Sequence, residues 1–330
     1  MKRVFFIAAI IALGTWSVMA QRAANAVASV SAIDAVQFKA GSDLGSALAA
    51  NGSIFSATVL RVEPLTKNVK GEDSNAVLHA SLDVKIDEWL WNQRPDLGST
   101  FQLDQTVVPG KRRLSSEERT VWDDVDVQVG GKLIVALSRN QDAPRKYLFV
   151  VSDVDLFPAV GVALMWHRQY LSDPGSLVSA PELVNDSQNP FFLGYFASYL
   201  WRGGSFGNRD EEAIALGKLL THTRPVAGSS GLIRIALQRY VMSDSKPLSR
   251  SAHRSVTESL VIAGSSEDLK VAQPAITLLI RLAQERKLEM RPYLTGDRSV
   301  GLSMNFRTLV QTGKVDRNHA AFYSQLIKTP

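Results

Sequence analysis

The spacing of apolar residues changes once along this chain, and the change limits the folds that the chain can adopt. Before Pro158, apolar residues recur at every second position, most clearly from Leu78 to Asp87, where polar side chains alternate with them. That period is typical of a β-strand with one face in a core and one in water. After Pro190, as in Ile233–Tyr240, they recur every three or four positions, which is the period of an amphipathic helix. The sequence therefore predicts an α+β protein of two domains, β-rich first and α-helical second.

The β-rich part holds short strand-like segments that follow one another without a helical segment between them. Such a series favours a small antiparallel barrel or a sandwich. The predicted strands are Ser53–Val62, Leu78–Leu90, Gly98–Leu103, Asp124–Val129, Lys132–Leu137 and Tyr147–Val151.

A short helix near Asp43, these strands and the segment Val129–Leu137 (VGGKLIVAL) follow in an order that resembles the OB-fold-type barrel of netrin-like domains. The resemblance covers about residues 42–155 and implies a small OB-like β-barrel. The chain lacks the cysteines that mark the extracellular animal members, and the resemblance implies no functional residue.

The α-helical part is a series of segments of helical length joined by short turns. Consecutive helices of this kind resemble a HEAT-like α-solenoid. No residue signature repeats at a fixed period, so an irregular helical bundle is the alternative. The predicted helices are Phe191–Trp201, Asp210–Leu220, Gly231–Val241, Ser249–Ile262, Asp268–Leu288 and Asn318–Ile327.

From these patterns we expect, in chain order, a signal peptide, a flexible N-terminus, a β-barrel domain, a linker and an α-helical domain. Within the linker, prolines and glycines interrupt regular structure, and Val160–Leu171 fits either a strand or a helix. The expected ranges are 1–20, 21–41, 42–157, 158–190 and 191–330.

The N-terminus has the layout of an export signal. Lys2 and Arg3 precede the apolar run Val4–Leu13, and Val18–Ala20 offers side chains that suit cleavage before Gln21. The run is shorter than the roughly 20 residues that a membrane-spanning helix needs. We therefore expect a secreted or periplasmic protein. An uncleaved N-terminal anchor is the alternative.

Composition limits the chemistry and the partners of the chain. It contains no cysteine, which excludes disulfides, thiolate metal sites and thiol nucleophiles. Residues 21–175 hold 16 Lys and Arg against 19 Asp and Glu, whereas residues 176–330 hold 19 against 13. The basic second half suits an envelope protein, a glycan or an anionic surface as partner. Nucleic acid is disfavoured, because export removes the chain from it and no basic cluster alternates with aromatic residues.

One string has the form of a catalytic motif. Gly203–Gly207 reads G-x-S-x-G, the turn that presents the nucleophilic serine of α/β-hydrolases, and Asp297 and His319 follow Ser205 in the required order. The context argues against this interpretation, because Phe191–Trp201 is helical in pattern and the alternation of parallel strands and helices is missing. A glycine-rich turn between helices explains the string more simply.

Neither a metal nor a cofactor is expected. Asp124 and Asp126 alternate with valines, so the acidic group that they form with Asp123 fits the wet face of a strand better than a calcium loop. The histidines are dispersed and lack zinc-ligand spacing.

Three tryptophans are the candidate ligand-binding residues. Trp89 and Trp91 are predicted to share one side of their strand, with Trp122 in a later segment. Exposed rings form a platform for a glycan, a peptide or a protein, and the alternative is that they plug the barrel end. The sequence thus favours an exported, non-catalytic binding or scaffold protein, with a serine hydrolase using Ser205 as the alternative.

Overall fold

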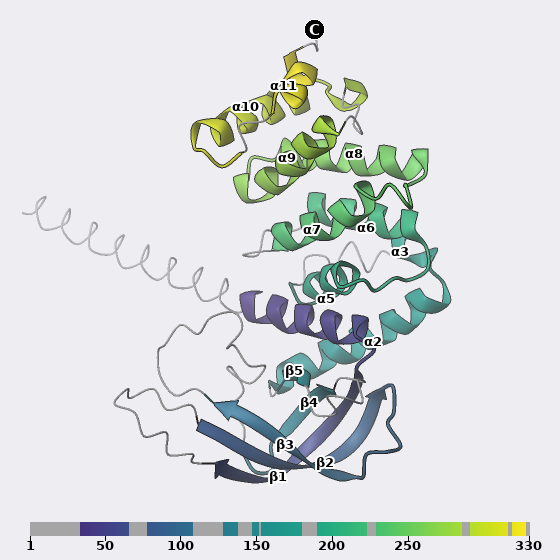
Figure 1. Cartoon of the computed structure of the whole chain (residues 1–330), viewed down its shortest axis with the longest axis vertical. Helices are drawn as coiled ribbons and strands as arrows, with labels where there is room; N and C mark the ends of the chain where they lie inside the picture. Colours follow the sequence, from purple (N-terminus) through teal and green to yellow (C-terminus); the bar gives the residue numbers. More distant parts are fainter. Residues whose placement is uncertain are drawn as a thin grey trace, which may run out of the picture.

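The computed structural model has an antiparallel sheet at one end and a stack of helices rising from it (Figure 1). The predicted α+β class and its order of β-rich and helical parts are therefore confirmed. The expected signal peptide (1–20) lies outside the described residues. The described residues are 34–65, 78–107, 128–137, 147–151, 153–179, 190–222, 229–285, 291–315 and 319–327.

The sheet has five strands in the order β3-β2-β1-β4-β5, and every neighbouring pair is antiparallel. Within the described residues it is an open sheet with β3 and β5 at its edges, so it is not the closed barrel that the sequence predicted. Most of the predicted segment Asp124–Val129 lies outside the described residues. The strands are β1 (Ser53–Leu65), β2 (Leu78–Trp91), β3 (Thr100–Val107), β4 (Lys132–Leu137) and β5 (Tyr147–Val151).

The open sheet is strongly curled. Phe55 of β1 and Phe101 of β3 pair with Trp89 and Val84, which lie five residues apart on β2, about 16 Å in an extended strand. Nevertheless, the Phe55 and Phe101 rings are 5.3 Å apart between centroids. The curl encloses a core on this face of the sheet. Its buried members are Phe55, Ala57, Val59, Leu82, Val84, Leu103, Leu133, Val135 and Leu137.

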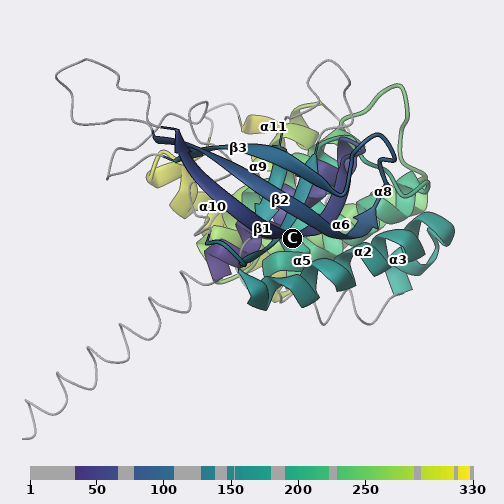
Figure 2. The same ribbon diagram turned by 90° about the horizontal axis from the view of Figure 1, so that it is seen from below.

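The opposite face of the sheet packs on the helices. Ile54, Ile134 and Ala136 belong to the same buried cluster as the helical side chains, so one core continues from the sheet into the stack. In Figure 2 the strands lie across the end of the helical stack. The alternation that predicted β2 arises because Leu82 and Val84 are buried inside the curl, whereas Lys85 is exposed to water.

Residues 34–49 form a helix that precedes β1 yet packs on the helical part, beside α5 (Figure 1). Residues 34–41 are therefore helical, where the sequence predicted a flexible segment. Gly194 of α5 explains the contact, because a Cβ there would lie 2.2 Å from the carbonyl oxygen of Phe38. The hydroxyls of Ser46 and Ser198 are 2.8 Å apart across the same crossing. The two helices thus pack backbone to backbone.

The helices agree with most of the predicted segments. Val160–Leu171 is a helix rather than a strand, and α10 was not predicted. Two short 3₁₀ helices, Val154–Leu156 and Arg291–Tyr293, complete the set. The helices are α2 (Phe157–Ser172), α3 (Ser176–Ser179), α5 (Pro190–Trp201), α6 (Arg209–His222), α7 (Ser229–Val241), α8 (Arg250–Gly264), α9 (Leu269–Gln284), α10 (Asp297–Gln311) and α11 (Ala320–Ile327).

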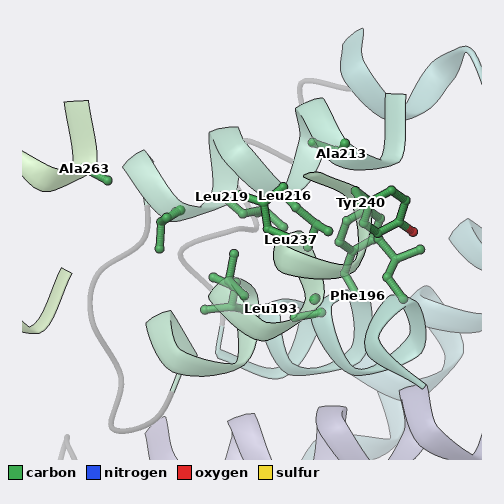
Figure 3. Close-up of a cluster of buried hydrophobic side chains, with 14 of the residues drawn as sticks. Leu193, Phe196, Ala213, Leu216, Leu219, Leu237, Tyr240 and Ala263 are labelled. Carbon is green, nitrogen blue, oxygen red and sulfur yellow. The ribbon is translucent and has the colours of Figure 1, made fainter. Parts of the chain in front are cut away.

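From α5 onward the helices stack in two layers. One layer runs α5, α7, α9 and α11, the other runs α6, α8 and α10, and each helix contacts the next one in its layer. Figure 3 shows the side chains between α5, α6 and α7, where Leu193, Leu216 and Leu237 meet in one cluster. Apolar side chains are thereby buried between neighbouring helices, both within a layer and between the two layers.

His167 of α2 lies inside the junction of sheet and helices. It is 2 % exposed, and its Nδ1 lies 2.8 Å from the hydroxyl of Tyr195. Its ring meets Trp91 of β2 edge-on at 5.1 Å. Burial lowers the pKa of His167 to about 4, because the charged imidazolium would lose its hydration.

This burial predicts an acid-sensitive junction. The unfolded chain binds a proton at His167 below its ordinary pKa of 6.5, whereas the folded chain does so only near 4, so stability is full above pH 6.5 and falls as the pH approaches 4. The full loss from this group is about 3 kcal/mol. Urea denaturation at about pH 7.5 and about pH 4.5 measures most of it, and His167→Gln is expected to reduce the difference by about 2.5 kcal/mol. Tyr195→Phe keeps the imidazole and should keep the difference; equal pH dependence in His167→Gln and the wild type would contradict the prediction.

Candidate functional site

A cleft of about 470 Å³ opens beside the turn between α5 and α6. Its walls come from the end of α5, this turn, the first residues of α6, the end of α7 and the loop between α7 and α8. The volume lies within the range of roughly 300–1,000 Å³ that is usual for small-molecule sites. The lining residues are Leu200, Gly203, Gly204, Ser205, Gly207, Arg209, Glu212, Arg239, Tyr240, Ser243 and Lys246.

The backbone conformation and the close packing of the α5–α6 turn require glycine. Gly203 and Gly207 have φ of 100° and 97°, which L side chains rarely adopt. A Cβ on Gly204 would lie 2.4 Å from the ring of Tyr199, whose hydroxyl donates to the carbonyl of Ser205 at 3.0 Å. The glycine-rich string is thus a tight turn that joins two helices and leaves space for a tyrosine beneath it.

Glu212 organises the floor of the cleft. Its side chain is 2 % exposed, although it carries a carboxylate. Oε1 accepts from the Ser205 hydroxyl at 2.8 Å and from the amide of Phe206 at 2.5 Å, and Oε2 accepts from the Tyr240 hydroxyl at 2.8 Å. The three donors repay the desolvation of the carboxylate and join the turn, α6 and α7.

Two arginines fasten the helix ends around the cleft. Arg209 donates from Nε to the carbonyl of Lys246 at 2.8 Å and from Nη2 to those of Arg239 and Tyr240 at 3.1 and 3.0 Å. Arg239 donates from Nη1 to the carbonyls of Leu200, at 2.8 Å, and Trp201. Apart from that of Lys246, which lies in the α7–α8 loop, these carbonyls are at the ends of α7 and α5, where a helix has no further amides for them and where positive charge is favourable.

The tyrosine of the cleft stays protonated. Burial raises the pKa of Tyr240, and the neighbouring carboxylate of Glu212 raises it further. The phenol is therefore a donor to Glu212 at any physiological pH. Arg209 also lies over the Tyr240 ring, 4.8 Å from its centroid, so the ring and the cation support each other.

The three residues of the hydrolase interpretation are not brought together. Ser205 lies in the turn after a helix, and its hydroxyl donates to Glu212 and accepts from the Gly207 amide at 3.0 Å. Asp297 begins α10, and the ring of His319, just before α11, packs on Phe306 at 5.0 Å between centroids. Helices α8 and α9 lie between α10 and α11, which carry or adjoin these two residues, and the α5–α6 turn that holds Ser205 (Figure 1). The arrangement that activates a nucleophilic serine is not present among these residues.

The paired tryptophans lie on opposite faces of the sheet, not on the shared side that the sequence predicted. Ile54 pairs with Trp91 but Phe55 pairs with Trp89, so Leu90 is the extra residue of a β-bulge. Trp89 packs edge-on against Phe55 at 5.2 Å, inside the curl of the sheet. Trp91 faces the helices instead. Neither ring pairs with the other to form a platform.

On the helical side, Trp91 meets His167 and the guanidinium of Arg168, which is 5.3 Å from the ring centroid. Trp122 and the acidic group Asp123, Asp124 and Asp126 lie outside the described residues. Within the part of the chain that the structure describes, no three or more His, Asp or Glu side chains are grouped so as to hold a metal ion.

Sequence spacing alone did not indicate the cleft, although one signal was present. Glu212 stands four residues before Leu216 and seven before Leu219 on the apolar stripe of α6. A carboxylate at a core position requires buried donors, and such a position is a reason to look for a polar site.

No protein-family model matches the chain, and no curated protein or solved structure is significantly similar to it. Among the described residues, no helix combines the length and the apolar character required to span a bilayer.

Proposed function

We propose that this is an exported, non-catalytic binding or scaffold protein whose helical stack carries the recognition surface. The observation that supports this most directly is the cleft, where cationic side chains are fixed around a turn whose serine is bound to a buried carboxylate. Rigid donors around a cavity suit recognition, because little side-chain freedom is lost when a ligand binds. Candidate partners are an envelope protein, a glycan or an anionic surface.

A finer interpretation of the fold is part of the proposal. The curled open sheet is an opened relative of the OB-like, netrin-type barrel, and the layered helices are a short HEAT-like α-solenoid. The contacts between alternate helices support the solenoid over an irregular bundle, since each unit of a solenoid contacts its neighbours. We propose 191–330 as the helical domain and 1–20 as a signal peptide cleaved before Gln21. Of the β-rich domain predicted at 42–157, the first residues belong instead to the helix of residues 34–49, which packs on α5. Sequencing the N-terminus of the exported protein tests the cleavage.

Site-specific photo-crosslinking in intact cells tests the binding function. A photo-reactive residue at Ser243, on the rim of the cleft, is expected to give a discrete adduct. The same residue at Leu60, exposed on β1, serves as the control and should not give that adduct. Identical adduct patterns at both positions, or none at Ser243, would count against recognition by the helical stack.

The alternative function, a serine hydrolase, makes a separate prediction. Purified protein is expected to hydrolyse aryl esters and peptides no faster than buffer, with Ser205→Ala equal to the wild type. The variant should lose about 1 kcal/mol of stability, because one hydrogen bond to the buried Glu212 carboxylate is removed. Esterase assays and urea denaturation measure the two quantities. Wild-type hydrolysis that disappears in Ser205→Ala would replace the binding function with the enzymatic one.

A further inference from the structure

The cleft beside the α5–α6 turn carries an excess of positive charge. Arg209, Arg239 and Lys246 line it, against the carboxylate of Glu212 among the described lining residues. Both oxygens of Glu212 already accept from Ser205, Phe206 and Tyr240. The carboxylate is therefore bound to neutral donors, and the charge of the cations is left for another group.

Each arginine uses part of its guanidinium on the protein and leaves other donors unused. Arg209 bonds through Nε and Nη2, and within the described residues no acceptor faces its Nη1. Arg239 bonds through Nη1, and in the same part of the chain its Nε and Nη2 have no acceptor. The carbonyls at the ends of α5 and α7 hold both planes in fixed orientations. The unused Nε and Nη2 of Arg239 form one edge that can give an oxyanion paired N–H bonds, and Nη1 of Arg209 adds a further fixed donor.

The other residues that line the cleft, and its volume, indicate what kind of anion it can hold. At Gly203 an added Cβ would stand 3.7 Å from Nη2 of Arg239, so the glycine leaves this edge open. Lys246 is exposed, and its ammonium has no partner among the described residues. At about 470 Å³ the cleft exceeds the volume of a bare phosphate or carboxylate, so it has space for the organic part of a ligand.

We infer that this cleft binds a small organic anion, whose phosphate or carboxylate group lies between the unused donors of Arg209 and Arg239. This inference rests on the proposed binding function and gives it a ligand class. The ammonium of Lys246 closes over the bound group from the rim.

Phenyl phosphate and benzoate test the two anion chemistries, with benzyl alcohol as the neutral control. Amide resonances of Gly203–Gly207 and of the end of α7 are expected to shift with phenyl phosphate or benzoate and not with benzyl alcohol. Arg239→Gln should weaken the affinity by at least about tenfold, which is usual for losing a charge-assisted pair. Arg202→Gln is the matched control, because Arg202 lies in the same turn but over the Trp201 ring, 4.2 Å from its centroid. It should change the affinity by less than about twofold.

Lys246→Gln keeps the test valid if Arg239→Gln unfolds, since the exposed Lys246 side chain holds no other residue in the described part of the chain; a loss of about threefold is expected. Response to one probe alone assigns the ligand to phosphates or to carboxylates, and both results support the inference. Equal affinities in Arg202→Gln, Arg239→Gln and Lys246→Gln would overturn it as non-specific charge attraction. Failure of both anions, with the Ser243 adduct still formed, would overturn the ligand class and leave the binding function standing.

Discussion

Glu212→Leu is expected to lower the free energy of unfolding by about 4 kcal/mol, one of the two largest losses that a single substitution should cause here. Leucine fills most of the volume of the glutamate but accepts no hydrogen bond. The amide of Phe206 and the hydroxyl of Tyr240 are then buried without a partner, and the Ser205 hydroxyl must turn to water. Urea denaturation followed by circular dichroism measures the loss.

Glu212→Gln is the control that separates hydrogen bonding from shape. Its amide oxygen replaces Oε1, so a smaller loss of about 1–2 kcal/mol is expected. Tyr240→Phe removes the hydroxyl that donates to Oε2 of Glu212. The double variant Glu212→Gln/Tyr240→Phe should lose less stability than the sum of the two single variants, because the two residues share one hydrogen bond. A Glu212→Leu variant as stable as Glu212→Gln would mean that the carboxylate does not hold the turn.

Strand β2 shows which features of the fold can be predicted from the sequence and which cannot. The alternation of Leu82 and Val84 predicted β2, because period two is imposed by the geometry of a strand with a buried face. The bulge at Leu90 was invisible, since it depends on register with β1 and not on residue type. The prediction of a platform from Trp89 and Trp91 failed for this reason.

The missed helix α10 has a different cause. Its apolar stripe is narrow, with Leu302, Phe306 and Leu309 at the correct spacing among polar residues. Asn305 on the same side donates to the carbonyls of Gly264 and Ser266 at 2.9 and 2.7 Å and so caps the end of α8. A polar residue buried for a tertiary bond weakens the local pattern from which helices are predicted.

The cleft could not be predicted either, because its cations meet through tertiary structure. Arg209 and Arg239 are thirty residues apart, and what fixes them is the set of carbonyls at two helix ends. The formal G-x-S-x-G string lies in the cleft for an unrelated reason, the tight turn that requires glycine at positive φ. A tight turn between helices and the turn that presents a catalytic serine both require glycine, so only the neighbouring helices and strands distinguish the two.

The other large effect is expected from Gly194→Ala in α5. In an ordinary helix this change is stabilising by up to about 1 kcal/mol. Here the new Cβ would lie 2.2 Å from the carbonyl oxygen of Phe38 and 2.8 Å from the amide nitrogen of Ser42, both backbone atoms that cannot rotate away. The helix of residues 34–49 must move outward, and we expect a net loss of about 3 kcal/mol from the overpacked contact.

Gly161→Ala in α2 is the matched control, because nothing lies within 4 Å of a Cβ added there. It should be neutral or slightly stabilising in the same urea titration. Limited proteolysis adds a local readout, since trypsin should cut after the exposed Lys39 sooner in Gly194→Ala than in Gly161→Ala. If the helix undocks before the remainder of the chain unfolds, cleavage will precede the main transition, which identifies it as a separately attached element. Equal stability and equal cleavage in the two variants would show that the glycine crossing does not hold this helix against α5.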